Sequence, residues 1–526
     1  MAACTMKATY RFVVYAILLS LPSHILFAAE QEDPDLPKIA IVGGGLGGTA
    51  AAYFLRQLFG DQLQVDVFEG KSVGGRLAVI SIEGQEYEAG GAVIHPRNEY
   101  MVNLTKLLGL ERRNPKDDDG TMGLYSKDGL FFKTSIWKVV TIAKLFWRYG
   151  WDIKRIGEWV TTMMSSFSRI YEYQEKGMAF TTVEDMLKAM DEQFINYTRI
   201  SAQTMFKDAG FSEIFINELV MSAMRVNYGQ TTDTHGFVAA VSMAGVESGL
   251  WSVKGGNKNV AESLLKASGA RLIQGKVTNI NMMKSATGMP SYEVQYEKAG
   301  QQADQEESIA EYDLVIMATP LDGNAKMKVV FEGFPSTFNI PNIPFHSLEA
   351  MFVCGHVNLS TFGMDQQDEL PDSIMTTNAE VFFNSIGLLE PVDEISNKAG
   401  KPEESEEYGV WKVFLNKVPT EAEVQALFDT RKSVQLVNWL AYPQYQPTKE
   451  LPSFVLYDRL YFINAIEAAA SAMEMSVIGA KNVALLAYNQ WYSHLDKIDE
   501  VLVPSDSSQD SAQGKQAQES VKSEEL

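Results

Sequence analysis

The chain has 526 residues, of which 46% are hydrophobic and 21% are charged, a composition typical of globular proteins. This length exceeds that of one compact core and predicts two or more domains. Its 45 basic and 67 acidic residues give a net charge of −22, which argues against nucleic acid as a partner because phosphate binding needs concentrated Lys and Arg. Its six histidines are scattered, and no spacing in the sequence predicts a metal site.

Residues 1–29 are predicted to be a signal peptide that is absent from the folded protein. Lys7 and Arg11 precede the apolar run 12–21, and Ala28 and Ala29 come just before an acidic stretch, as in secretory signals. An N-terminal membrane anchor is the alternative, but the run is short for the roughly 20 residues of a membrane span. Cleavage would leave 43 basic and 67 acidic residues, a net charge of −24.

The most informative stretch, 38–70, predicts a strand, a helix and a second strand. The first strand leads into Gly43-x-Gly45-x-x-Gly48, and the second ends at Glu69. Gly43 permits a tight turn, Gly45 lets the backbone approach a pyrophosphate, and Gly48 lets the helix pack closely on the sheet. Glu69 is expected to bind a ribose hydroxyl; the alternative is an exposed acid at a strand end. Together these features predict a dinucleotide site.

The next segment predicts a β-hairpin, because residues 74–95 alternate apolar and polar residues around Gly84-Gln85. It begins with Gly74, Gly75 and Arg76, which are expected to follow the pyrophosphate beyond the first glycine loop. The alternative for Arg76 is an ordinary surface charge.

Residues 97–245 are predicted to be rich in helices, most clearly over 135–176, where apolar residues recur at helical spacing. Ordinary core packing explains such a stripe. The alternative is that some of these side chains line an apolar substrate cavity or touch a membrane or lipoprotein surface. The aromatic members are Trp137, Phe146, Trp147, Trp151, Trp159 and Phe167.

The pattern returns to strands near residue 250. Residues 251–283 contain a glycine pair and predict an amphipathic helix followed by a strand. Val277 lies on this strand and is expected to contact the cofactor. A strand over 292–297 and a polar loop over 301–308 follow. The strand 312–320 is expected to be buried and to bring Thr319 close to the cofactor.

The last third of the chain predicts a β-rich region over 330–450 with an acidic insertion at 401–407. A strand and a long helix follow over 460–492, and residues 504–526 are expected to be disordered because Ser, Gln, Asp, Glu and Lys dominate there. We expect Cys354, which lies in an apolar strand, to be a core residue; a nucleophilic thiol is the alternative. Sequons at Asn103, Asn196 and Asn358 are candidate glycosylation sites.

Three features favour FAD over NAD: the continuation at Arg76, the small residues that end the strand 312–320, and the C-terminal strand and helix with Asn464 and Glu467. Pieces so far apart suit an extended FAD that threads through a split domain. Met473 and Glu474 begin the last helix, whose N-terminus is expected to face the flavin pyrimidine oxygens. The alternative is a core methionine and a solvent-facing acid.

Several of these motifs carry a family resemblance. The run VGGRL followed by EYEAGGAVIHP resembles the flavin amine-oxidase superfamily. More closely, GGAVIHP, LWSVKGGNK and GAKNVALLAYNQWY look like the prenylcysteine oxidase family, and the likeness covers about 38–500.

The resemblance implies an FAD-dependent thioether oxidase on the secretory route, lysosomal or secreted, that acts on farnesyl- or geranylgeranyl-cysteine. The alternatives are a flavin amine oxidase of another substrate and a non-catalytic flavin-containing protein that binds isoprenoids or lipids. Cysteine, a prenyl aldehyde and hydrogen peroxide would be the products, and a small isoprenoid thioether and O₂ the partners. Gly90, Gly91 and Ala92 would run beside the flavin. His95 is the candidate for positioning water or moving a proton; a histidine bonded in a structural turn is the alternative.

We therefore predict an α/β fold with a Rossmann-like FAD-binding domain assembled from separated segments, plus an α+β substrate domain. The FAD-binding domain would comprise 38–115, 250–325 and 451–500. The substrate domain would comprise a helix-rich part, 116–249, and a second part, 326–450.

Overall fold

The computed structural model describes residues 36–113, 120–245, 249–284, 288–300, 307–321, 329–393 and 408–502. The predicted signal peptide, the acidic insertion 401–407 and the tail 504–526 lie outside the described residues, as does most of the polar loop 301–308. The described residues from Lys38 onward form one compact unit.

A nine-stranded sheet, counted over the described residues, carries the predicted strand–helix–strand unit. Its order is β11-β10-β9-β2-β1-β12-β20-β19, with β13 beside β9. The five central strands from β9 to β20 are parallel. The strands are β1 (Lys38–Val42), β2 (Gln64–Glu69), β9 (Arg271–Lys284), β10 (Pro290–Lys298), β11 (Ser308–Tyr312), β12 (Leu314–Met317), β13 (Val330–Glu332), β19 (Val455–Tyr457) and β20 (Leu460–Phe462). Segments hundreds of residues apart share one sheet, which confirms the predicted fold class.

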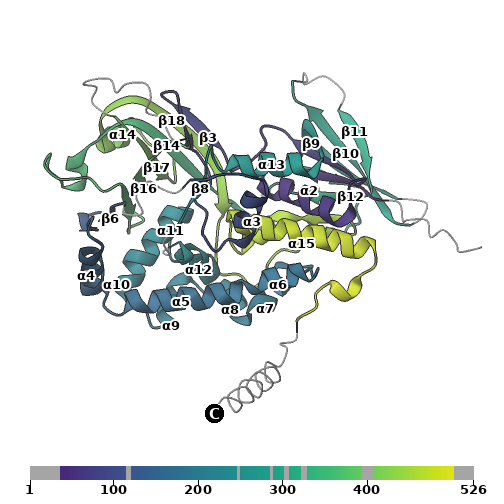
Figure 1. Cartoon of the computed structure of the whole chain (residues 1–526), viewed down its shortest axis with the longest axis horizontal. Helices are drawn as coiled ribbons and strands as arrows, with labels where there is room; N and C mark the ends of the chain where they lie inside the picture. Colours follow the sequence, from purple (N-terminus) through teal and green to yellow (C-terminus); the bar gives the residue numbers. More distant parts are fainter. Residues whose placement is uncertain are drawn as a thin grey trace, which may run out of the picture. The chain divides into compact units, whose positions relative to one another are not determined.

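Three helices cover this sheet next to the glycine loop: α2 (Leu46–Phe59), α13 (Lys258–Ser268) and α15 (Met473–Trp491). In Figure 1 the purple helix α2 lies between teal α13 and yellow α15, and it contacts both. The buried run Ala50–Ala52 explains this close packing, because small side chains let a helix be covered on several sides. Helix α2 is thus fixed against both later segments.

A second sheet contains seven strands among the described residues, in the order β18-β14-β17-β16-β15-β6-β7. They are β6 (Met122–Ser126), β7 (Gly129–Lys133), β14 (Phe345–Val357), β15 (Ser373–Thr376), β16 (Phe383–Leu388), β17 (Gly409–Leu415) and β18 (Phe428–Pro443). Cys354 on β14 is buried, which confirms it as a core residue, and burial raises the pKa of its thiol.

The hairpin β6–β7 differs from the prediction of a helix-rich stretch over 97–245. Residues 122–133 pair with each other and, through β6, with β15 more than 240 residues later. The turn is formed by Lys127 and Asp128, and Gly129, the first residue of β7, has φ of 115°, which glycine adopts without strain. Through its pairing with β15, this short hairpin becomes part of the second sheet.

The other described helices lie mainly between residues 99 and 245, as expected. They are α3 (Glu99–Leu107), α4 (Lys138–Tyr149), α5 (Asp152–Phe167), α6 (Arg169–Glu175), α7 (Val183–Met190), α8 (Glu192–Arg199), α9 (Ala202–Asp208), α10 (Glu213–Phe215), α11 (Met221–Tyr228), α12 (Gly236–Ala244) and the later α14 (Glu421–Leu427). A π-helical turn, η1 (Ile216–Val220), joins α10 to α11, and the 3₁₀ segments are η3 (Leu359–Phe362), η4 (Ile463–Ala468) and η5 (Leu495–Lys497). None of the helices in the described part of the chain is long and apolar enough to cross a bilayer.

The predicted hairpin after the first glycine loop is present as β3 (Val79–Ile82) and β4 (Gln85–Glu88). Its turn residues are Glu83 and Gly84, which both have positive φ, as a two-residue hairpin turn requires. A further short pair, β5 (Arg112–Arg113) and β8 (Ser252–Val253), joins the helical segment to the stretch that follows it.

The aromatic stripe over 135–176 has two environments. Phe167 is buried, and Trp159 packs against Phe206 with ring centroids 5.1 Å apart, so core packing holds for this end. The interpretation as core packing is wrong for the other four aromatic residues, which are all exposed: Trp137, Phe146, Trp147 and Trp151. The stripe is one helical pattern in sequence but not one buried face.

Candidate functional site

The site is organised around the glycine loop that leaves β1. Gly43 has φ of 116°, and a Cβ there would lie 2.6 Å from the carbonyl oxygen of Ala318 at the end of β12. A Cβ on Gly48 would collide with the carbonyl oxygen of Gly43. The two glycines therefore allow the sharp turn and the close contact of α2 with the sheet, as the sequence predicted.

Gly45 faces space rather than packed atoms. A Cβ on Gly45 would have only Gly74 and Gly75 within 4 Å, both at 3.9 Å. Gly74 donates its N–H to Gly44 at 2.9 Å, which holds the second glycine pair beside the first. Helix α2 starts at Gly45 without a side-chain cap. Its first N–H groups are thus available to an anion, and the surrounding glycines leave room for one.

Glu69 lies beside this loop at the end of β2. One carboxylate oxygen accepts the N–H of Gly44 at 2.9 Å, and the other accepts the N–H of Lys71 at 2.7 Å. The side chain is half-buried, so it is not simply a solvent-facing acid. A carboxylate oriented in this way retains lone pairs for ligand hydroxyls.

Thr319 and Val277 approach the same edge of the sheet. Thr319 follows β12, and its backbone N lies 3.4 Å from the position of a Cβ on Gly43. Val277 is buried on β9, three residues after Gln274, which is the strand partner of Glu69. Both predicted residues therefore lie near the carboxyl ends of parallel strands, where α/β sheets bind ligands.

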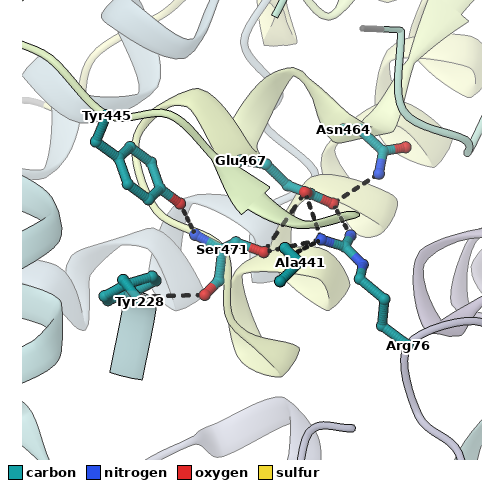
Figure 2. A network of polar contacts seen from close by, with 7 residues as sticks. All are labelled: Arg76, Tyr228, Ala441, Tyr445, Asn464, Glu467 and Ser471. Atoms are coloured by element: carbon teal, nitrogen blue, oxygen red, sulfur yellow. Dashed lines mark hydrogen bonds and ion pairs between the residues drawn. The ribbon is translucent and has the colours of Figure 1, made fainter. Parts of the chain in front are cut away.

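Arg76 forms an ion pair with Glu467, 391 residues later (Figure 2). Its guanidinium donates twice to that carboxylate, once at 2.9 Å, and also to the carbonyl oxygen of Ala441 at 2.7 Å. Glu467 is nearly inaccessible and additionally accepts the amide of Asn464 at 2.6 Å. The alternative of an ordinary surface charge is therefore wrong for Arg76. Its guanidinium connects the first glycine segment to the C-terminal segment.

The same network reaches aromatic side chains of α11 and of the segment that follows β18. Tyr445 accepts the N–H of Ser471 at 2.8 Å, and Tyr228 donates to the carbonyl oxygen of Ser471 at 3.2 Å (Figure 2). The rings of Tyr228 and Tyr442 meet edge to face, with centroids 5.0 Å apart. An apolar aromatic surface thus lies next to the ion pair of Arg76 and Glu467. The sequence analysis did not single out these tyrosines, which lie on two segments, α11 and the end of β18 with the residues after it.

Gly90 and Gly91 run antiparallel to the segment that contains Arg76. Gly91 donates to the carbonyl oxygen of Arg76 at 3.1 Å, and a Cβ on Gly91 would lie 3.8 Å from Met473 Cγ. Asn257 donates to the carbonyl oxygen of Gly91 at 2.9 Å. Three predicted segments, at residues 76, 90–92 and 473, therefore converge, with Ala92 half-buried beside them.

A buried acid and a buried amine, missed by the sequence analysis, flank this convergence. Lys412 on β17 contacts the carbonyl oxygens of Glu88 and Gly90 at 3.3 and 3.5 Å. Burial lowers the pKa of Lys412 to about 8 and raises the pKa of Glu88 to about 7. Oε1 of Glu88 accepts the N–H of Asn257 at 2.7 Å. The available signal was a lysine inside the apolar strand GVWKVFL.

Glu474 is buried and does not face solvent, so the alternative of a solvent-facing acid is wrong. Its carboxylate accepts the N–H groups of Tyr100 and Met101 at 2.8 and 2.9 Å and the hydroxyl of Tyr171 at 2.8 Å. It therefore caps the start of α3. Burial raises its pKa to about 7 despite these bonds. Any contact of this residue with a flavin would come from the backbone at the uncapped start of α15.

His95 is buried in the turn before α3. Its Nδ1 accepts the N–H of Arg97 at 3.1 Å, and its carbonyl oxygen accepts the N–H of Asn98 at 3.0 Å. The alternative of a histidine bonded in a structural turn is therefore present. The bond also fixes the tautomer, because an accepting Nδ1 places the proton of the neutral ring on Nε2.

Comparisons with known proteins agree with this geometry. A family model described as prenylcysteine lyase matches residues 132–500, and one described as an NAD(P)-binding Rossmann-like domain matches 41–108. Prenylcysteine oxidase 1 from Homo sapiens is 42% identical over 471 residues, which are 88% of this chain and 91% of the relative.

The chain belongs to the prenylcysteine oxidase family. Prenylcysteine oxidase 1-like from Bos taurus is 37% identical over 489 residues, 92% of this chain and 97% of the relative. The family resemblance drawn from GGAVIHP and LWSVKGGNK is thereby confirmed.

Solved structures show the same fold at low identity. Cyclohexylamine oxidase from Brevibacterium oxydans superposes with a TM-score of 0.53 at 15% identity, covering 86% of this chain and 99% of that one. Putrescine oxidase gives a TM-score of 0.51 at 14% identity, covering 87% and 99%. The expectation of FAD as the cofactor is confirmed by the family, the Rossmann-like match and this oxidase fold together. The open space at Gly45 and the uncapped helix α2 fit its pyrophosphate.

The ion pair between Arg76 and Glu467 generates a stability prediction. Glu467→Gln removes the carboxylate partner of Arg76, whose side chain is 32% exposed, and should lower the free energy of unfolding by about 2 kcal/mol. Arg76→Met/Glu467→Gln should cost less than the sum of the two single changes, by about 1 kcal/mol or more. Chemical denaturation measures these values. Glu158→Gln, in an ion pair with both side chains 69% exposed, is the control and should change stability by less than about 0.5 kcal/mol. Additive effects of the two buried changes would contradict the coupling.

Glu474 generates a pH prediction. Its pKa is higher in the folded protein than in the unfolded chain, so its contribution to stability is complete below about pH 4.5 and is lost as the pH rises through about 7. Glu474→Gln does not titrate. The difference in melting temperature between the wild type and Glu474→Gln should therefore favour the wild type most at pH 5 and shrink by pH 8. The exposed Glu213→Gln serves as the control, and a constant difference across this range would refute the shifted pKa.

Proposed function

We propose that the protein cleaves the thioether bond of prenylcysteines by FAD-dependent oxidation. The main support for this proposal is the 42% sequence identity, over 88% of the chain, to a relative named prenylcysteine oxidase 1. Farnesyl- and geranylgeranyl-cysteine are the proposed substrates. One molecule each of prenylcysteine, O₂ and water would give one each of cysteine, prenyl aldehyde and hydrogen peroxide.

The chemistry requires a hydride acceptor, and bound FAD supplies it, together with the reduction of O₂. Water then adds to the oxidised carbon next to sulfur, and the carbon–sulfur bond breaks with its electron pair on sulfur. The thiol takes a proton and leaves, and the carbon becomes an aldehyde. This balance needs no protein nucleophile, which agrees with the buried position of Cys354.

The chain's own residues would bind and orient the cofactor in four ways. Gly43, Gly45 and Gly48 with the start of α2 would hold the pyrophosphate, and Glu69 would bind a ribose. Gly75 and Arg76 would border the pyrophosphate, while Val277 and Thr319 would pack against the dinucleotide. Gly90, Gly91 and Ala92 would lie along the flavin ring, and the first backbone N–H groups of α15, at Met473 and Glu474, would face its oxygens. The support is the convergence of these segments around one uncapped helix.

His95 is the candidate for handling the proton or the water. It lies four residues after Gly91. Its Nδ1 accepts the backbone N–H of Arg97, so Nε2 would be the atom that donates a proton to the water or the substrate. A residue in a rigid, buried turn can hold a water in one place without reorganising. Its contribution is tested by His95→Gln, which should lower the turnover number while the bound FAD stays stoichiometric.

Flavin content and activity test the proposal. The purified protein should be yellow and contain one FAD per chain, whereas Glu69→Ala/Gly45→Val should lose the colour because a valine side chain fills the space at Gly45. Gly157→Val, at an exposed glycine of α5 with nothing within 4 Å of a Cβ, is the matched control and should keep it. Stoichiometric flavin in the double variant would refute the cofactor site.

Farnesylcysteine should bleach the flavin without oxygen and produce peroxide with oxygen. Turnover of a polyamine or amino acid instead would make the protein an amine oxidase. Isoprenoid binding without flavin reduction would make it a non-catalytic binding protein. Either outcome would refute the proposed reaction.

We also propose that the protein enters the secretory route and works in the lysosome or outside the cell. The signal-like N-terminus and the three sequons support this. Asn103 on α3 and Asn196 on α8 are exposed, while Asn358 caps η3 and its Oδ1 accepts the N–H of Ser360. Protein from animal cells should therefore shift in mass on treatment with an N-glycosidase, and Asn103→Gln should remove part of that shift. Unmodified protein in the cytosol would contradict this route.

A further inference from the structure

We propose that the face formed by residues 136–151 is a membrane-binding surface that docks on a bilayer with anionic headgroups. The inference does not depend on the oxidase reaction, since it rests on the exposure and charge of one helix and the residues that flank it. We call this face the α4 surface.

Large hydrophobic side chains gather on the α4 surface. Of the 22 exposed large hydrophobic side chains among the described residues, eight lie between 136 and 151. They include Trp147 at 88% exposure, Val139 at 80%, Trp137 at 70% and Trp151 at 68%. These three tryptophans are the exposed ones in the described part of the chain. Scattered single residues of this kind are ordinary, whereas a contiguous group marks an interaction site.

The helix is held to the protein by its end, which leaves its apolar side uncovered. Tyr149 is the one buried residue of α4, and its hydroxyl donates to Glu218 of η1 at 2.8 Å. Arg148 donates twice to the same carboxylate, at 2.6 and 2.7 Å. At the other end, the hydroxyl of Thr141 bonds the backbone of Ser135. Figure 1 shows α4 at the edge of the helical part of the molecule, beside α10. The attachment is polar and firm, so the exposed apolar side is a stable feature of the fold.

The charge around the α4 surface is opposite to that of the chain. Residues 133–158 contain six basic and two acidic side chains, whereas the whole chain has a net charge of −22. Arg148, Lys154 and Arg155 form ion pairs with Glu218, Glu158 and Asp152, so the excess of positive charge comes from Lys133, Lys138 and Lys144. A strongly acidic protein is repelled by an anionic bilayer unless a basic face is turned toward it. The local charge therefore selects both the kind of surface and the orientation of the protein on it.

A lipid surface fits these observations better than a second copy of the chain. A two-fold dimer through this face would bring two basic segments together and add like-charge repulsion. Tryptophan is the residue that favours the boundary between headgroups and hydrocarbon, because its ring is apolar and its N–H is polar. A short amphipathic helix with basic residues and exposed tryptophans is typical of proteins that lie on membranes without crossing them. No helix of the described residues could cross one.

Vesicle binding tests the proposal on the purified, flavin-loaded chain. The wild type should sediment with vesicles of phosphatidylcholine and phosphatidylserine, and brominated lipids should quench its tryptophan fluorescence. Val139→Gln/Trp147→Gln should weaken vesicle binding by about 10-fold or more, because it removes the two most exposed apolar side chains from the helix. Lys138→Gln/Lys144→Gln should weaken binding to anionic vesicles and flatten its dependence on phosphatidylserine content.

Val418→Gln/Leu495→Gln is the matched control, since these side chains are 60% and 65% exposed on other segments. It should bind vesicles like the wild type. Flavin content and circular dichroism confirm that each variant is folded. Equal binding by Val139→Gln/Trp147→Gln and the wild type would overturn the proposal, as would absence of wild-type binding. A wild-type dimer that this variant dissociates would make the α4 surface a self-interface, and equal binding to pure phosphatidylcholine would refute the anionic preference.

Discussion

The ion pair between Arg76 and Glu467 is the interaction on which the site depends. It joins residues from the beginning and the end of the folded chain, and it does so where the glycine segment, β18 and η4 meet. A charge removed from water is favourable only when it has close partners, and the Glu467 side chain is 2% exposed. Glu467 obtains these from Arg76 and Asn464, and Arg76 also binds a backbone carbonyl. The pair therefore fixes how the C-terminal segment approaches the glycine loop, and with it the start of α15.

Buried ionisable groups surround the same region. Glu88, Lys412 and Glu474 all have pKa values moved toward neutrality by burial. Each is held by backbone groups rather than by a full counter-charge, so each sits close to the point at which it changes protonation. The two acids favour the folded protein at acidic pH, which agrees with the proposed lysosomal route. They also give the site groups that exchange protons without any metal or nucleophile.

The α4 surface is a second functional region, and it differs from the site in its exposure to solvent. The site around Arg76 excludes water and pairs its charges, whereas α4 exposes tryptophan and valine to solvent. An isoprenoid thioether partitions into lipid, so a protein that lies on a membrane meets its proposed substrate at a higher local concentration. The firm attachment of α4 through Glu218 is consistent with this use, because a flexible helix would lose entropy on docking.

The sequence alone determined the local parts of the protein. The spacing of Gly43, Gly45 and Gly48 specifies a turn and a helix contact within six residues. The apolar pattern over 312–320 specifies a buried strand, and the pattern over 460–492 specifies a strand followed by a long helix. The glycine loop, Arg76 and the small residues that end the strand 312–320 pointed to the cofactor, and the family motifs pointed to the substrate. These features depend on backbone geometry and side-chain periodicity over short distances, which a sequence displays directly.

The tertiary structure alone decided which distant groups meet and which faces stay open. Arg76 and Glu467 are 391 residues apart, and Glu474 caps a helix that begins near residue 99, so no local pattern names either partner. The helical stripe over 135–176 was visible, but a hydrophobic period states only that a helix has an apolar side. Whether protein or solvent covers that side depends on the packing of the whole chain, which buries Phe167 and leaves Trp147 exposed.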